Sequence, residues 1–339
     1  RDYNRYLEEG KTAWESYLPR QAFQAFSNAI DLEPESEEAK AGLAQCQTII
    51  DEVEQMTAQA EQHEENGELD MALAILEKII EKDPESQEAP KAHEALNGRM
   101  EKAKALIEDA NVETGTRDWG KALTKWEECL MYWGAYAPAL EGKEKAAELL
   151  EKFEAQYAIS KELHSRKKIT AALAEHEKAL EIGISDEALM LNDEMQASHK
   201  QAEVLSEAGR GAHDESLWRE AAGKLEAAYK LNIESVDVDQ LHHAQTQCKK
   251  VEDAIEKSSA LLKDGHFFKA EDEARIGLTL GKDLKLEEIQ EKAKAHADEV
   301  REAIKIATDE EKSNPPKAVN LWHRVLELQP VNEALHLYM

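Results

Sequence analysis

Histidine and cysteine are the residues of this chain that could most readily bind a metal ion or act as nucleophiles. The sequence has 12 histidines and 3 cysteines, but it contains neither an HExxH nor a CxxC motif. His242 and His243 are adjacent, so on a helix their side chains point about 100° apart. His176 occupies a core position of the repeat pattern described below, which favours a packed or half-exposed side chain over a ligand. We therefore expect no metal site.

Catalytic motifs are absent as well. The chain lacks GxSxG, GxxxxGK[ST] and GxGxxG, and the short run from Gly209 to Gly211 has the wrong context for a phosphate loop. The 71 acidic residues are typical of solvated helix faces, and their spacing singles out no acid and base pair. We expect no enzyme activity, no catalytic residues and no bound cofactor.

Three aromatic residues are candidates for contacting a partner. Tyr132, Trp133 and Tyr136 surround Gly134 at the link between two expected helices. Aromatic side chains often anchor a bound protein segment. The alternative is that they pack the junction, because aromatic side chains are mostly buried where they can be.

Further candidates are scattered along the chain. Trp14 and Phe268 are weaker aromatic candidates of the same kind, with the same alternative. Arg166, Lys167 and Lys168 form a basic cluster in an expected turn. The cluster is either an exposed polar loop or a docking site for an acidic segment of a neighbour.

The charge of the chain limits its partners. The formal net charge is -29, and residues 1–100 hold 23 acidic and 9 basic side chains. A field of this sign repels phosphate backbones and anionic lipid, so we expect neither nucleic acid nor membrane as a partner. The acidity either keeps the surface soluble or attracts a basic protein or peptide. No apolar run approaches the length of a membrane span.

The cysteines indicate the compartment. Cys46 and Cys129 fall on apolar positions, so we interpret them as small buried hydrophobic residues. Cys248 lies far from both, and no disulfide pairing is indicated. These features fit a reducing compartment, and we expect a cytoplasmic protein.

A repeat predicts the fold class. Helix-forming residues dominate the composition, with 15 glycines and 8 prolines in 339 residues. An alanine recurs in a matching setting with gaps of 50, 50, 50, 49, 49 and 48 residues, at Ala22, Ala72, Ala122, Ala172, Ala221, Ala270 and Ala318. A fixed period of this size is typical of tandem structural units in a helical solenoid. The sequence therefore predicts an all-α repeat protein.

Columns around each alanine indicate a short helix. Three residues before it stand Leu69, Trp119, Ile169, Trp218 and Phe267 in the middle copies. Four residues after it stand Phe26, Leu76, Trp126, His176, Leu225, Ala274 and Trp322. Seven residues after it stand Ala29, Ile79, Cys129, Ala179, Ala228, Gly277 and Val325. These spacings place the columns on one face of a helix, which Pro34, Pro84, Gly134 or Pro330 then stops.

A small residue stands twelve positions before the alanine, at Gly10, Ala60, Ala110, Ser160, Gly209 and Ser258. Small side chains let two helices approach closely. The complete pattern resembles the tetratricopeptide (TPR) repeat, a family of paired antiparallel helices, over essentially the whole chain. The resemblance implies a fold that binds proteins or peptides. This chain departs from the family in its repeat of about 50 residues, against about 34 in the family.

The surplus residues fall in the first helix of each unit. Apolar or small residues recur there every seven positions, for example at Ala39, Cys46, Val53 and Ala60, or at Ala89, Leu96, Ala103 and Ala110. A break in the helix would normally lose this phase. We therefore expect one continuous helix of about 28 residues, starting near Ser36 in the second unit and roughly 42 Å long.

A long helix followed by a short one predicts a shape. If the short helix returns only about 14 residues, each unit advances by roughly 20 Å. We expect an elongated rod of three-helix bundles that share continuous helices, as in spectrin-like rods. The alternative is a superhelix of units stacked side by side. The expected units are residues 3–35, 36–85, 86–135, 136–184, 185–234, 235–283 and 284–339.

Two functions remain open after these exclusions. The first is a non-catalytic protein interaction scaffold. The second is a structural spacer whose length, rather than its surface, is functional. Because the chain begins at Arg1 and ends at Met339 as a further helix would begin, we expect a regulatory or assembly segment of a larger protein.

Overall fold

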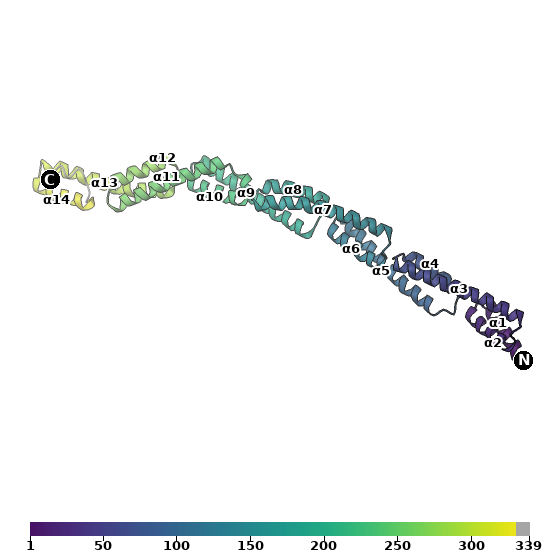
Figure 1. Ribbon diagram of the computed structural model, residues 1–339. Coiled ribbons are helices and arrows are strands. Elements are labelled where there is room, and N and C mark those ends of the chain that lie inside the picture. Colours follow the sequence, from purple (N-terminus) through teal and green to yellow (C-terminus); the bar gives the residue numbers. More distant parts are fainter. Residues whose placement is uncertain (330–339) are drawn as a thin grey trace. The chain divides into compact units, whose positions relative to one another are not determined.

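The computed structural model describes residues 1–329 and shows an all-helical chain. Within this part there are 14 α-helices, one short 3-10 helix and no strand (Figure 1). The expected all-α fold class is therefore confirmed. The start of a further helix after Pro330, and the role of Pro330 as a helix stop, lie outside the described residues.

Eight helices are short, with 14 residues each. They are α1 (Asp2–Glu15), α2 (Pro19–Leu32), α4 (Leu69–Lys82), α6 (Trp119–Tyr132), α8 (Ile169–Ile182), α10 (Trp218–Leu231), α12 (Phe267–Leu280) and α14 (Pro315–Leu328). The apolar residue of the column three positions before the recurring alanine is the first residue of its helix. The seven recurring alanines are all buried.

The other six helices are long. They are α3 (Glu37–Glu65), α5 (Glu88–Thr116), α7 (Ala137–Ser165), α9 (Asp186–Asp214), α11 (Val238–Lys263) and α13 (Leu284–Glu311). Ser36 caps α3 by accepting a hydrogen bond from the backbone N–H of Ala39 at 3.2 Å. The 3-10 helix Ile233–Ser235 precedes α11, which is the shortest of the six with 26 residues.

Each long helix is continuous, as the seven-residue spacing predicts. In α3 the side chains of Ala39, Cys46, Val53 and Ala60 are all buried. The first half of the helix and the second half therefore present the same stripe to their neighbours. An interruption between them would rotate one half of the stripe out of the core.

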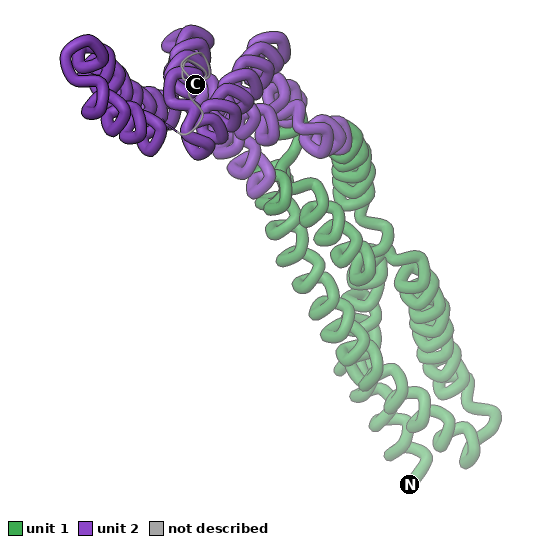
Figure 2. Tube along the Cα trace, turned by 90° about the vertical axis from the view of Figure 1, so that its left-hand side faces the viewer, with its two compact units in different colours: residues 1–156, 178–188 green, residues 157–177, 189–339 purple. Residues whose placement is uncertain are grey.

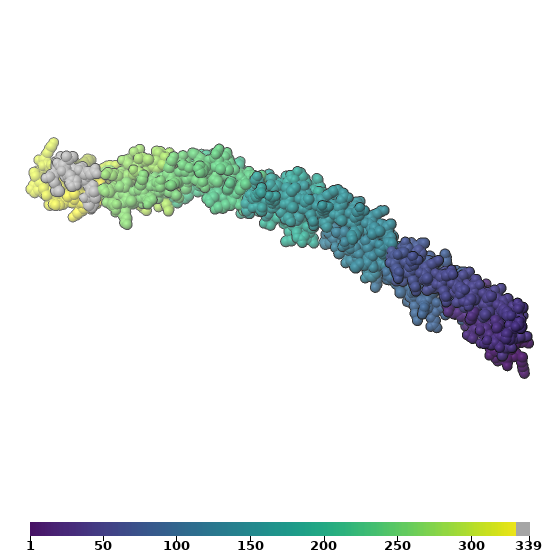
Figure 3. Space-filling model, viewed as in Figure 1, coloured from purple at the N-terminus to yellow at the C-terminus, as the bar shows by residue number. Residues whose placement is uncertain are grey.

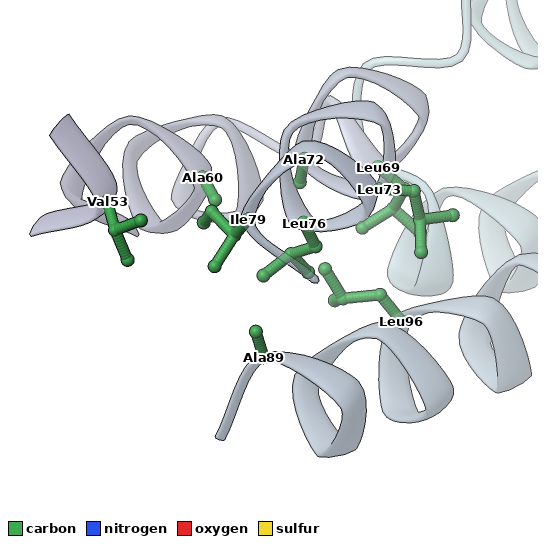
Figure 4. Close-up of a cluster of buried hydrophobic side chains, with 9 residues drawn as sticks. All are labelled: Val53, Ala60, Leu69, Ala72, Leu73, Leu76, Ile79, Ala89 and Leu96. Carbon is green, nitrogen blue, oxygen red and sulfur yellow. The ribbon is translucent and has the colours of Figure 1, made fainter. Parts of the chain in front are cut away.

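Three short helices pack between the helix before and the helix after them. Helix α2 contacts the short α1 and the long α3, α4 contacts the long helices α3 and α5, and α12 contacts the long helices α11 and α13. Figure 4 shows the core around α4, in which Leu76 and Ile79 lie between side chains of α3 and α5. This core keeps apolar side chains of α3, α4 and α5 away from water. Such burial supplies most of the stability of packed helices.

The turns before six of the short helices, α2, α4, α6, α8, α10 and α12, share a backbone conformation. One residue in each of six turns has a positive φ angle, between 56° and 78°, namely Tyr17, Gly67, Arg117, Lys167, Ser216 and Gly265. Only glycine adopts this region at no steric cost. The other four residues have side chains, so the same conformation is strained there.

The chain divides into two compact units (Figure 2). Unit 1 comprises residues 1–156 and 178–188, and unit 2 comprises residues 157–177 and 189–339. Helices α7, α8 and α9 each contribute residues to both. The elongated rod expected for the whole chain stays a prediction, as do the bounds of the seven repeats.

Candidate functional site

Successive short helices within each unit are joined by backbone hydrogen bonds. In four junctions an N–H group just after one short helix donates to the carbonyl oxygen of the turn before the preceding short helix. The bonds are Ala135 to Gly67 at 3.3 Å, Ile184 to Arg117 at 3.0 Å, Ile233 to Lys167 at 2.9 Å and Lys282 to Ser216 at 3.1 Å. The accepting residue is in each case the turn residue with positive φ. These bonds fix the end of one short helix against the start of another.

Side chains reinforce two of these junctions in the same way. Trp119 donates its indole N–H to the carbonyl oxygen of Ile182 at 2.7 Å, and Trp218 donates to that of Leu280 at 2.5 Å. Each ring fits only because glycine follows the accepting residue. A Cβ atom at Gly183 would lie 2.6 Å from the Trp119 ring.

The junction between α8 and α10 is polar instead. The fully buried Asn232 accepts a hydrogen bond from the backbone N–H of Ile169 at 3.2 Å and donates to Thr170 Oγ1 at 3.0 Å. Because the buried amide is paired on both sides, it costs little to bury. Asn232 therefore joins the end of α10 to the start of α8.

The junction between α2 and α4 differs from these four. Pro84 follows the end of α4 and has no N–H to donate. The next N–H, of Glu85, donates to Asp83 Oδ1 at 3.2 Å rather than to the preceding turn. As a result, within residues 1–329 the carbonyl oxygen of Tyr17 accepts no hydrogen bond.

Charged groups hold this junction in place of the backbone bond. The buried Asp83 accepts a hydrogen bond from Arg20 Nε at 2.7 Å, and this contact raises the pKa of the Arg20 guanidinium. Glu85 Oε2 accepts from the backbone N–H groups of Arg20 and Gln21 at 2.9 and 3.1 Å. A carboxylate at these two N–H groups stabilises the N-terminus of α2.

A pocket of about 650 Å³ opens beside this junction in unit 1. The residues that line it are Trp14, Glu15, Tyr17, Pro19, Ile49, Glu81 and Lys82. They come from the end of α1, the turn to α2, the middle of α3 and the end of α4. The purple surface in Figure 3 marks the N-terminal residues that include α1 and α2. The volume is within the range of ligand-binding sites. We call this site the Trp14 pocket.

Tyr17 is the most exposed apolar residue of the Trp14 pocket. Its φ angle is 56°, and the equivalent turn position has a positive φ whether it holds glycine, as at Gly67, or a residue with a side chain, as at Arg117. A left-handed conformation costs a residue with a side chain about 1–2 kcal/mol. The side chain is nevertheless 76% exposed, so burial does not offset this cost. Arg117, Lys167 and Ser216 carry the same strain at the equivalent turns, so it is a feature of the repeat.

The rim of the Trp14 pocket is acidic. Lys82 forms an ion pair with Glu52, which neutralises its charge. Glu15 and Glu81 are both exposed, and neither forms an ion pair within the described part of the chain. The rim therefore carries two carboxylates without a compensating cation.

The aromatic trio predicted from sequence packs a junction. The rings of Trp133 and Tyr136 lie 4.3 Å apart between centroids. Trp133 is half-buried against the core cluster that contains Leu69. The Nζ atom of Lys102 lies 5.7 Å from the centre of the Tyr132 ring. These contacts agree with the packing alternative, and a partner contact at these residues stays a prediction.

The remaining candidates lie elsewhere. Phe268 is half-buried, with the Arg301 guanidinium 5.0 Å from its ring centre. Arg166, Lys167 and Lys168 are exposed in the turn before α8, and Arg166 pairs with Glu162 at 2.6 Å. Only Trp14 among the sequence candidates lines the Trp14 pocket.

His176, Cys46 and Cys129 lie in the core. His176 is fully buried, and its Nδ1 lies 3.0 Å from Ser160 Oγ. Cys46 and Cys129 are buried free thiols, and burial raises the pKa of each. Among residues 1–329, no three His, Cys, Asp or Glu side chains are grouped as a metal would require. No helix of that range is both long and apolar enough to cross a membrane.

Comparison with known proteins finds similarity only at the level of structure. No family model and no curated protein matches the sequence. The P58(IPK) TPR domain is 16% identical over 97% of this chain and 98% of that chain, with a TM-score of 0.19. The TPR2AB domain of yeast Sti1, in complex with pHSP90, is 13% identical over 86% of this chain and 98% of that chain, with a TM-score of 0.15. Both neighbours are TPR domains. At these TM-scores neither similarity supports a function for this chain.

Sequence reasoning found Trp14 but missed the rest of its pocket. Tyr17 could have been found, because it stands 50 residues before Gly67 in the turn column. Ile49 and Glu81 could not, since the packing of α3 and α4 against the first turn brings them there.

Proposed function

We propose that this chain is a non-catalytic protein interaction scaffold that holds a segment of a partner protein in the Trp14 pocket. The observation that carries this proposal is the pocket itself. Apolar side chains of Trp14, Tyr17, Pro19 and Ile49 line a cavity that no other part of the described chain fills. An exposed tyrosine, Tyr17, lies beside it.

The helical frame suits this role. The ring of Trp14 packs against the core formed by α1, α2 and α3, which limits its movement. Ion pairs and helix capping hold the adjacent junction. A preformed pocket loses less conformational entropy on binding than a flexible one. We further propose that the protein works in the reducing cytoplasm, where its three free cysteines would stay reduced.

Site-specific photo-crosslinking tests the proposal. A photoreactive phenylalanine analogue replaces Tyr17 in the full chain, and a matched variant carries it at Val112, which is 63% exposed on α5. We expect a discrete covalent adduct with a cellular protein at position 17 and none at position 112.

The same experiment separates the scaffold from a spacer. A structural spacer has no specific contact at position 17, so it yields either no adduct or the same faint products at both positions. Either result would overturn the proposed function.

A further inference from the structure

We propose that the Trp14 pocket recognises a partner segment in which one bulky apolar side chain is flanked by lysine or arginine. This inference rests on the proposed function and names the chemistry of the partner. The segment places its apolar side chain in the pocket and its cations at the rim.

The lining of the pocket favours an apolar side chain. Trp14, Tyr17, Pro19 and Ile49 present rings and aliphatic carbons to the cavity. Ile49 and Trp14 are half-buried in the structure, so an entering side chain removes their remaining exposed surface from water. Burial of a leucine-sized side chain stabilises a complex by about 1.5–3 kcal/mol. An alanine in its place loses most of that gain.

Charge complementarity selects the residues beside it. Glu15 and Glu81 lie on the rim without an ion pair in the described chain, while Lys82 is paired with Glu52. The surrounding residues 1–100 carry 14 more negative than positive charges, from 23 acidic and 9 basic side chains. This field attracts cationic segments and repels acidic ones.

The backbone of Tyr17 offers a third contact. At the four other turns named above, the equivalent carbonyl oxygen accepts a hydrogen bond from a backbone N–H just after the short helix that follows in the next repeat. Pro84 removes that donor at Tyr17. A backbone N–H of the bound segment takes the place of the missing donor.

Fluorine NMR tests the inference with defined probes. The full chain is labelled with 5-fluorotryptophan, and the Trp14 signal is assigned with a Trp14→Phe variant. Three short synthetic peptides are titrated. The first has a central leucine with two lysines on each side, the second replaces the leucine with alanine, and the third replaces the lysines with glutamates. We expect the first peptide to shift the Trp14 signal in a saturable way. Each of the other two should bind with an affinity at least about tenfold lower.

Two variants show where the peptide binds. Glu15→Gln with Glu81→Gln should weaken the lysine peptide and flatten its salt dependence. The matched control, Glu65→Gln with Glu181→Gln, removes two exposed carboxylates that occupy the equivalent positions in other repeats. It should leave binding unchanged. Tyr17→Gly should also weaken binding, and its fold is safe because glycine suits a positive φ.

The outcomes distinguish this inference from the proposed function. If the glutamate peptide binds as well as the lysine peptide, or if none of the three moves the Trp14 signal while position 17 still crosslinks to a protein, the chemistry stated here is wrong and the scaffold stands. If position 17 yields no specific adduct, the scaffold itself fails.

Discussion

The indole of Trp119 donates a hydrogen bond to the backbone carbonyl oxygen of Ile182 at 2.7 Å, although 63 residues separate the two. Trp218 and Leu280 repeat the relationship at 2.5 Å. In both cases a tryptophan at the first position of a short helix meets the last residue of the next short helix. Each of these junctions therefore joins two residues that lie more than one fifty-residue repeat apart in the sequence.

The fit of Trp119 predicts the effect of a single methyl group. Gly183→Ala places a Cβ atom 2.6 Å from the ring and 3.3 Å from the Arg117 carbonyl oxygen. Such overpacking costs about 1–3 kcal/mol. We expect urea denaturation to show this loss of unfolding free energy. Gly98→Ala in α5 is the control, because a Cβ atom added there has no neighbour within 4 Å. It should raise the free energy of unfolding by about 0.5–1 kcal/mol.

Gly67 makes a second prediction, based on backbone conformation. Its φ angle is 76°, and an added Cβ would lie 3.0 Å from Gly134 Cα. Gly67→Ala should lower the unfolding free energy by about 1–2 kcal/mol through the left-handed conformation alone. Thermal unfolding followed by circular dichroism measures it. A loss no larger than that of an ordinary exposed substitution would contradict the positive φ assigned to this turn.

Phe26 makes a third prediction, because two glycines surround it. A Cβ atom at Gly10 would lie 2.8 Å from the ring, and one at Gly42 would lie 2.7 Å from it. Gly10→Ala and Gly42→Ala should each destabilise by about 1–3 kcal/mol. A triple variant combines these two changes with Phe26→Leu. It then has the same three residue types that stand fifty positions later, at Ala60, Ala92 and Leu76.

The combined variant should recover most of the lost stability. The coupling is measured as the difference between the triple variant and the sum of the single changes. Strict additivity of the three changes would show that these residues do not share one packing site.

Cys46 predicts a dependence on pH. Burial raises the pKa of its thiol to about 11, from an ordinary value of 9.0. Between pH 9 and 11 the unfolded chain loses this proton while the folded chain keeps it, so the thiol lowers stability as the pH rises. The slope is at most about 1.4 kcal/mol per pH unit. Comparison of the wild-type chain with Cys46→Ala isolates it, and equal slopes in the two proteins would contradict the burial of this thiol.

Much of the helical frame could be predicted from residue spacing. The recurring alanine and its columns indicated the short helices, because those positions contact neighbouring helices in every copy. The seven-residue spacing of Ala39, Cys46, Val53 and Ala60 indicated a continuous α3, since only an unbroken helix keeps such a stripe on one side. Both predictions depend on local periodicity.

The contacts between successive repeats within a unit could not be predicted in the same way. The fit of Trp119 to Gly183 depends on how one hairpin is placed against another, which no local pattern encodes. The Trp14 pocket likewise depends on how α3 and α4 pack against the turn between α1 and α2. The aromatic trio at Tyr132, Trp133 and Tyr136 was a candidate because of its residue types, whereas in the structure the rings of Trp133 and Tyr136 contact each other at the junction.

The central claim, that the Trp14 pocket binds a protein segment, is tested most directly by an unbiased peptide display selection on the full chain, with counter-selection against the Tyr17→Gly variant. We predict enriched peptides that share one bulky apolar residue close to lysine or arginine and that lose binding to the variant. A selection that enriches no peptide, or only peptides that bind both proteins equally, would contradict the claim.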